Sequence, residues 1–213
     1  MSYGGIILKF AVLIILAYLL GAFPSGVIVG QIFFKKDIRQ FGSGNIGTTN
    51  TFRVLGRTAG IVVLALDILK GTVAASLPVW CQLGLPHYFI LVFGLAAILG
   101  HSFSIFIKFS GGKAVATSAG VLLAYNPQFF VIAVSTFVLI MLISSMVSMA
   151  SMLGMILITI FSFYYHDIFL TLTAVLLTIF IFYRHRANIK RIRQGTENLV
   201  PFGWYYHQQK KKK

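Results

Sequence analysis

The stretch FGSGNIGTTNTFRVLGRTAGIVVLALDILKGTVAASLPV, residues 41–79, joins two unlike kinds of sequence. Its first part, residues 41–53, holds three glycines, three threonines, two asparagines, a serine and an arginine. From residue 58 onward the chain is almost wholly apolar, for long enough that a helix crosses a bilayer core of about 30 Å. Backbone donors cannot enter lipid unless they find partners within the protein. The stretch therefore predicts a membrane-spanning helix preceded by a polar segment that binds something.

The composition of the whole chain extends this interpretation. Of its 213 residues, 58% are hydrophobic and only 10% are charged, and the mean hydropathy is +0.88. Several apolar runs could span a bilayer, so we expect an all-α, polytopic integral membrane protein. The single cysteine, Cys81, excludes an internal disulfide and a cysteine-based metal site.

We expect seven transmembrane helices with the N-terminus outside and the C-terminus in the cytoplasm. The expected helices lie near residues 6–30, 58–79, 88–107, 113–125, 128–147, 150–164 and 167–183. The fourth and sixth are short for a full span at about 1.5 Å per residue, so five spans remain an alternative. With seven spans, every basic residue except Lys9 and Lys70 lies in or beside an inner segment, as the positive-inside rule requires. We expect a single domain over residues 1–213, with a basic tail at 204–213.

Three polar, basic stretches fall on that inner side, at residues 41–57, 100–117 and 184–198. Glycines let backbone N–H groups approach an anion, and Ser, Thr and Asn side chains add further donors. Lys113 follows Gly111 and Gly112 and leads directly into a helix, whose first amides would face the same anion. Arg53 is able to hold a phosphate through two parallel bonds. The alternative for each stretch is an ordinary turn with positive-inside residues.

Several known motifs are absent from these stretches. Gly111–Lys113 is not a Walker A loop, because Ile107 stands where a glycine is required and no Ser or Thr follows Lys113. No histidine has an aspartate five positions later, and the carboxylates Asp37 and Glu197 lie only at the margins of the stretches. We therefore expect no metal and no cofactor. A substrate that carries its own phosphate leaving group suits this set of side chains.

The segments GSGNIGTTNTFR, GHSFSIFIKFSGGKAVAT and RHRANIKRIRQGTEN, with DILKG at 67–71 and VSMAS at 147–151, resemble the signature blocks of a known family. This is the bacterial acyl-phosphate:glycerol-3-phosphate acyltransferase (PlsY) family, and the resemblance runs from about residue 20 to 200. It implies a seven-helix enzyme of the inner cell membrane with its active site on the cytoplasmic face.

The activity that the resemblance implies is the first acylation step of bacterial phospholipid synthesis. A fatty acyl group passes from acyl phosphate to the 1-hydroxyl of glycerol 3-phosphate, giving 1-acylglycerol 3-phosphate (lysophosphatidate) and phosphate. The expected partners are these two substrates, membrane lipids and the enzyme that makes acyl phosphate, with no nucleic acid.

The candidate site residues come from all three stretches and from the serines between them. The catalytic candidates are Lys113, His185 and His101. The substrate-binding candidates are Gly42, Ser43, Gly44, Asn45, Gly47, Thr49, Asn50, Arg53, Gly111, Gly112, Ser148, Ser151 and Asn188. For His101 a structural hydrogen bond is the alternative to catalysis. Asp67 and Lys70 share a helix face, where they form either a structural ion pair or part of the site.

Two other classes of function fit part of the sequence. A transporter for phosphorylated compounds would also need cations and glycines within the membrane, but transporters usually carry internal repeats, and none is visible here. A basic membrane scaffold would not need this density of Gly, Asn and Ser. The acyltransferase interpretation accounts for more of the residues than either.

Overall fold

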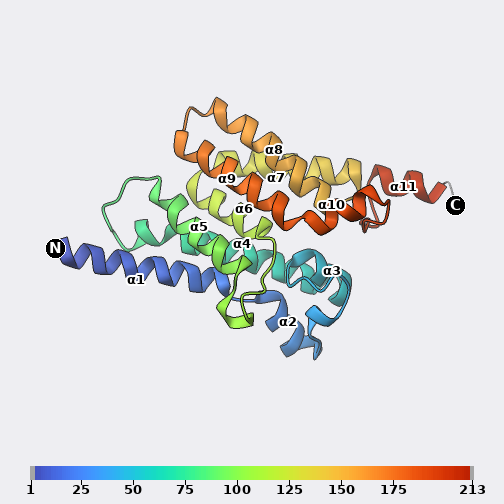
Figure 1. Cartoon of the computed structure of the whole chain (residues 1–213), viewed down its shortest axis with the longest axis horizontal. Helices are drawn as coiled ribbons and strands as arrows, with labels where there is room; N and C mark the ends of the chain where they lie inside the picture. The colour runs from blue at the N-terminus through green and yellow to red at the C-terminus, as the bar shows by residue number, and fades with distance from the viewer. Residues whose placement is uncertain (1–2, 212–213) are drawn as a thin grey trace. The chain divides into compact units, whose positions relative to one another are not determined.

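The structure, a computed structural model, describes residues 3–211, and within that range its regular elements are all helices (Figure 1). The elements are α1 (Tyr3–Ala22), α2 (Ser25–Phe34), η1 (Ile38–Gln40), α3 (Thr48–Leu55), α4 (Arg57–Trp80), α5 (Phe89–Ser102), η2 (Ile105–Ile107), α6 (Val115–Tyr125), α7 (Pro127–Ser144), α8 (Val147–Tyr164), α9 (Ile168–Arg184), α10 (Arg186–Arg193) and α11 (Trp204–Lys211). Here η denotes a short 3₁₀ helix. The expected all-α class is confirmed.

Five described helices are long and apolar enough to cross a membrane: α1, α4, α5 with its extension to Ile107, α7 and α8. A sixth span is present if α9 and α10, which bend by 60° at their junction, count as one. Helix α6 has 11 residues, or about 16 Å of length, which is too short to cross alone. The seven-span arrangement and the outward N-terminus stay predictions.

The chain divides into two compact units, Met1–Pro127 and Gln128–Lys213. The first contains α1 to α6, and the second contains the remainder of α7 and the helices up to α11. The single-domain organisation expected from the sequence stays a prediction.

The helix expected over residues 6–30 is wrong, because the chain breaks into α1 and α2 at Phe23 and Pro24. Proline lacks an N–H, and its ring disfavours helical geometry in the residue before it. The break releases backbone carbonyls inside an apolar segment, and side chains from elsewhere pair with them. Lys70 Nζ donates to the carbonyl of Phe23 at 2.9 Å, and Ser104 Oγ donates to that of Ala22 at 2.5 Å.

Three further boundaries differ from expectation. The α-helix expected over 88–107 ends at Ser102, with η2 following up to Ile107, and α3 and α10 form where no helix was expected. Both of these helices have only eight residues and are largely polar, so each is shorter than the window of about 11–18 residues over which an apolar pattern identifies a helix in sequence. Helix α3 begins after Gly47 and ends before Gly56, whose φ of 88° lies in the left-handed region that glycine adopts easily.

In the first unit, helices pack through glycines that allow close backbone approach. A Cβ at Gly120 in α6 would collide with the carbonyl oxygen of Ile68 in α4, and one at Gly71 would collide with that of Thr117. Thr72 Oγ1 donates to the carbonyl of Gly120 at 2.9 Å across the same contact. Such small-residue contacts are typical of helices packed within membranes. They fix the start of α6, where Lys113 lies, against α4.

We expect Gly120→Ala to destabilise the folded protein, because the new methyl group overlaps backbone that cannot move away. The cost should be about 1–3 kcal/mol, as for other overpacked cores. Gly154→Ala in α8 is the matched control, since a Cβ there meets its nearest atoms at 4.0 Å. Thermal unfolding in one detergent measures both variants. Equal melting temperatures for the two would contradict the close contact between α4 and α6.

Candidate active site

The first polar stretch is folded around the side chain of Asn50, which is 1% exposed. Its Oδ1 accepts a hydrogen bond from the backbone N–H of Ser43 at 2.9 Å. Its Nδ2 donates to the carbonyls of Ile38 at 2.9 Å and Phe41 at 3.1 Å. Gly42, with a φ of 62°, passes so close that a Cβ there would collide with Asn50 Oδ1. The side chain of Asn50 therefore shapes the loop by forming hydrogen bonds with the backbone of the loop.

The other candidates in this stretch divide into loop-forming and outward-facing groups. Asn45 Oδ1 accepts from the N–H of Gly47 at 3.0 Å, just before α3 begins, and Gly44 has a φ of 69°. Ser43, Thr49 and Arg53 are exposed. Thr49 and Arg53 are four residues apart on α3, so they share a face of this helix. These exposed donors are available to a ligand.

The second stretch doubles back on itself between α5 and α6. The N–H groups of Gly111 and Gly112 donate to the carbonyls of Ser102 and His101, each at 3.1 Å. A Cβ at Gly112 would collide with Nε2 of His101, so only glycine lets this turn lie against the imidazole. Lys113 follows at once, two residues before α6 begins, and is half-buried. The sequence interpretation placed Lys113 at a helix start, and the structure confirms that placement.

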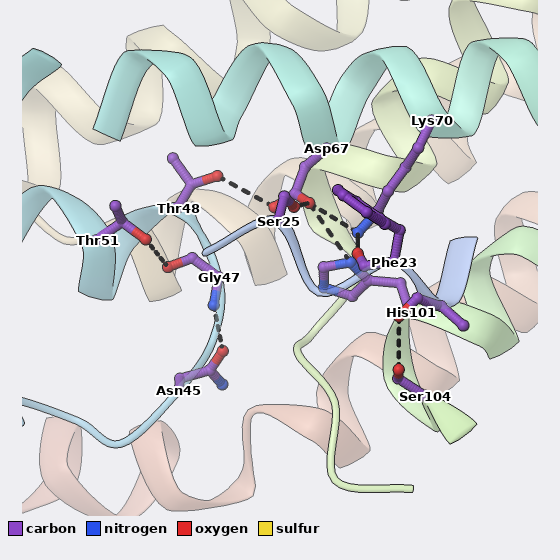
Figure 2. Close-up of polar contacts among 11 residues, drawn as sticks. Phe23, Ser25, Asn45, Gly47, Thr48, Thr51, Asp67, Lys70, His101 and Ser104 are labelled. Atoms are coloured by element: carbon purple, nitrogen blue, oxygen red, sulfur yellow. Dashed lines mark hydrogen bonds and ion pairs between the residues drawn. The ribbon is translucent and has the colours of Figure 1, made fainter. Parts of the chain in front are cut away.

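Between these two stretches lies a buried polar group that we call the Asp67 cluster (Figure 2). Its members are Ser25, Thr48, Asp67, Lys70 and His101. Asp67 Oδ1 accepts a hydrogen bond from Ser25 Oγ at 2.5 Å and pairs with Lys70 Nζ at 2.8 Å. It also lies 3.8 Å from Nδ1 of His101, while Oδ2 accepts from Thr48 Oγ1 at 3.5 Å. One carboxylate thus contacts residues from α2, α3, α4 and α5.

Reasoning from sequence found only part of this cluster. It noted Asp67 and Lys70 as charges within a span and left their function open, and it listed His101 as a catalytic candidate. It missed Ser25 and Thr48, which carry no distinguishing signal in one sequence. It also counted carboxylates only within the polar stretches, so it did not expect one beside His101.

The third stretch lies in the second unit and is organised by Glu197, whose side chain is 5% exposed. Glu197 Oε1 accepts hydrogen bonds from Ser148 Oγ at 2.8 Å and Asn188 Nδ2 at 2.7 Å. Its Oε2 accepts from Arg191 Nε at 2.8 Å. Sequence reasoning chose Ser148 and Asn188 but missed the carboxylate that joins them. Arg191, which was not among the candidate residues, pairs with Glu197.

The two remaining candidates in the second unit bond to backbone of their own helices. Ser151 Oγ donates to the carbonyl of Val147 at 2.8 Å. His185 lies where α9 meets α10, is 2% exposed, and has Nδ1 at 2.8 Å from the carbonyl oxygen of Ile181. That contact fixes Nδ1 as the protonated nitrogen, since a carbonyl only accepts.

Carboxylates elsewhere in the described chain do not build a metal site. Within residues 3–211, His, Cys, Asp and Glu side chains form no group of three or more suited to a metal ion. Asp37 precedes η1 and pairs with Arg39 at 2.6 Å. The hydrogen bonds from Arg39 hold the pKa of the Asp37 carboxyl below its usual value. Asp37 is thus an anion of the surface loop, separate from the Asp67 cluster.

An apolar hollow of about 340 Å³ lies between α1 and α4 in the first unit. Leu20 and Phe23 line it from the α1 side, Leu69 and Lys70 line it from α4, and Phe106 closes it. Lys70 is shared with the Asp67 cluster. The hollow therefore places an apolar surface next to the buried polar group.

Apolar spans with buried polar clusters near helix ends define the class of the protein as a helical integral membrane protein. Residues 11–195 match the family described as glycerol-3-phosphate acyltransferase. The chain is 61% identical over 206 residues to the glycerol-3-phosphate acyltransferase of Latilactobacillus sakei, covering 97% of this chain and 100% of that protein. It is 60% identical over 199 residues to glycerol-3-phosphate acyltransferase 2 of Lactobacillus acidophilus, covering 93% and 94%.

Solved structures agree with these relatives. The crystal structure of PlsY (YgiH), an integral membrane glycerol 3-phosphate acyltransferase, in its glycerol 3-phosphate form is 35% identical, with a TM-score of 0.82. The match covers 89% of this chain and 94% of that one. The lysophosphatidic acid form of the same protein gives 34% identity and a TM-score of 0.78. The chain belongs to the glycerol-3-phosphate acyltransferase family, and it is an acyltransferase enzyme.

We expect Glu197→Gln to lower the melting temperature of the protein. The amide keeps one acceptor for Ser148 and Asn188, but it presents an NH₂ group to Arg191 and loses the charge-assisted bond. Such bonds contribute about 1.5–3 kcal/mol. Asp37→Asn is the matched control, because exposed ion pairs contribute about 0–1 kcal/mol. A Glu197→Gln protein that melts together with the Asp37→Asn protein would contradict the organising function of Glu197.

Proposed function

We propose that this enzyme transfers a fatty acyl group from acyl phosphate to the 1-hydroxyl of glycerol 3-phosphate. The products are lysophosphatidate and inorganic phosphate, and the reaction is the first acylation of bacterial phospholipid synthesis. The observation that carries the proposal is the 61% identity to a glycerol-3-phosphate acyltransferase over nearly the whole chain. The choice of acyl phosphate as donor is supported by the signature blocks and by the side chains of the site.

Glycerol 3-phosphate is proposed to bind at the start of α3. Ser43, Thr49 and Arg53 are the exposed donors there. The side chain of Asn50 fixes the loop that contains Ser43 by accepting a hydrogen bond from the backbone N–H of Ser43. Arg53 is able to grip the phosphate through two parallel bonds. In the second unit, described by itself, we propose His185, Asn188, Ser148 and Ser151 as substrate-binding residues.

Lys113 is proposed to hold the phosphate of the acyl donor. It lies just before α6, and free N–H groups at a helix start favour an anion. As the hydroxyl oxygen bonds to the acyl carbon, the bond from that carbon to the phosphate oxygen breaks. Lys113 and the first backbone amides of α6 then stabilise the departing phosphate.

The donor is already activated, so positioning and charge stabilisation should supply most of the rate. The proton of the attacking hydroxyl is proposed to pass to a substrate phosphate oxygen, or to His185 or His101. The reaction should need neither a divalent metal nor a carboxylate as its base. The acyl chain is proposed to lie in the hollow between α1 and α4, where Leu20 and Leu69 offer an apolar surface.

The test is a reaction with purified protein, radiolabelled glycerol 3-phosphate and acyl phosphate. We expect labelled lysophosphatidate and an equal amount of released phosphate, with most of the rate retained in EDTA. Lys113→Ala should abolish turnover, and Asp37→Asn is the control that should retain most of it. Absence of product from the wild-type protein would overturn the proposed function. Loss of activity in EDTA that added magnesium restores would overturn the metal-free mechanism.

Arg53→Lys should weaken binding of glycerol 3-phosphate although the charge is kept. Lysine cannot make two parallel bonds to phosphate, and one charge-assisted bond contributes about 1.5–3 kcal/mol, or roughly tenfold to a hundredfold in affinity. The KM for glycerol 3-phosphate measures this, and the KM for acyl phosphate serves as the internal control. An unchanged KM for glycerol 3-phosphate would remove Arg53 from the phosphate site.

We further propose that the polar stretches face the cytoplasm in the inner cell membrane, with the N-terminus outside. The distribution of the basic residues supports this orientation, because cytoplasmic segments carry an excess of Lys and Arg. Basic residues on that side would also contact anionic lipids, and the enzyme that makes acyl phosphate is proposed as a partner there. Single cysteines at the exposed positions 43, 108 and 193, one in each polar stretch, introduced after Cys81→Ser, should resist an impermeant reagent on intact cells and react once the membrane is opened. Labelling of intact cells at these positions would show the opposite orientation.

A further inference from the structure

The mechanism proposed above leaves Asp67 and Thr48 without a function, although Asp67 is 2% exposed and lies within a helix that is apolar enough to span the membrane. A charge in such a position is costly unless it is paired. Lys70, one helical turn away, neutralises it at 2.8 Å. Charge balance alone would need no more than this ion pair within α4.

The remaining contacts of Asp67 lead to the two substrate-binding stretches of the first unit. Thr48 is the first residue of α3, which carries Thr49 and Arg53. His101 lies in the last turn of α5, and Gly112 packs against its ring and bonds to its carbonyl. Figure 2 shows Thr48 and His101 on opposite sides of the Asp67 carboxylate.

We propose that Asp67 is a positioning residue for the acyl transfer, and that it acts through Thr48 and His101. Its two carboxylate oxygens fix the start of α3 and the turn at Gly111–Lys113 relative to each other. This inference rests on the proposed function, in which α3 holds glycerol 3-phosphate and Lys113 holds the donor phosphate. Asp67 touches neither substrate; it sets the separation of the two groups that must react.

Misplacing reacting groups by about 1 Å costs on the order of a hundredfold in rate even when each substrate still binds. A positioning function therefore predicts a fall in kcat with little change in substrate binding. A purely charge-balancing function predicts that the ion pair is replaceable by apolar side chains. Buried ion pairs often tolerate such replacement without loss of stability.

The decisive variant is Asp67→Leu combined with Lys70→Met, which removes both charges together and keeps similar side-chain volumes. We expect a folded protein whose kcat is lower by roughly a hundredfold. Its KM for glycerol 3-phosphate should change by less than about threefold, and glycerol 3-phosphate should still raise its melting temperature as in the wild type. Asp37→Asn is the matched carboxylate control.

A second pair of variants keeps the proposal testable if the double variant does not fold. Thr48→Ser keeps the hydroxyl that reaches Asp67, and Thr48→Ala removes it. We expect Thr48→Ala to lower kcat by about tenfold or more and Thr48→Ser to restore most of it. Both proteins should keep the melting temperature shift caused by glycerol 3-phosphate.

Three results would overturn the positioning function. They are a double variant as active as the wild type, a loss of activity that only matches the loss of folded or ligand-binding protein, and equal rates for Thr48→Ala and Thr48→Ser. The wild-type reaction is measured alongside. Absence of product from it would overturn the proposed function instead, so the two failures are distinguishable.

Discussion

The buried carboxylate of Asp67 sets the constraint on which the first unit depends. A charge inside a membrane-spanning helix requires a counter-charge and hydrogen-bond donors, because the hydrocarbon supplies neither. Lys70 provides the charge at Oδ1, which Ser25 and His101 also approach, and Thr48 approaches Oδ2. Satisfying one anion thereby brings together residues of four helices.

Two features of the backbone make this convergence possible: a break in the first apolar run at a proline, and close contacts at glycines. Pro24 interrupts the first apolar run, so Ser25 reaches Asp67 and the carbonyl of Phe23 becomes a second acceptor for Lys70. Glycines allow close approach at other positions. Gly120 lets α6 approach α4, and Gly112 lets the turn before α6 lie against His101. Polar side chains and small residues thus replace the hydrophobic effect as the source of packing specificity in the membrane.

Much of the fold follows from apolar run length, which places α4 to α9 within a few residues of their observed positions. Helices α3 and α10 were missed because each has only eight, largely polar residues, too few for an apolar pattern to identify a helix. The position of Gly111–Lys113 just before a helix could be predicted, because it depends on the local order of residues. The convergence of Thr48 and Asp67, and of Ser148 and Glu197, depends on tertiary packing, which spacing in one sequence does not encode.

In the proposed function, the two polar stretches of the first unit form one active site for two phosphates, which the buried carboxylate of Asp67 holds together. Hydrogen exchange of the purified enzyme, measured over a series of concentrations of glycerol 3-phosphate and acyl phosphate added together, tests this arrangement most directly. Backbone amides of residues 42–50 and 111–115 should both become protected, and they should do so over the same range of substrate concentration. Protection confined to one stretch, or reached at clearly different concentrations in the two, would contradict a single site.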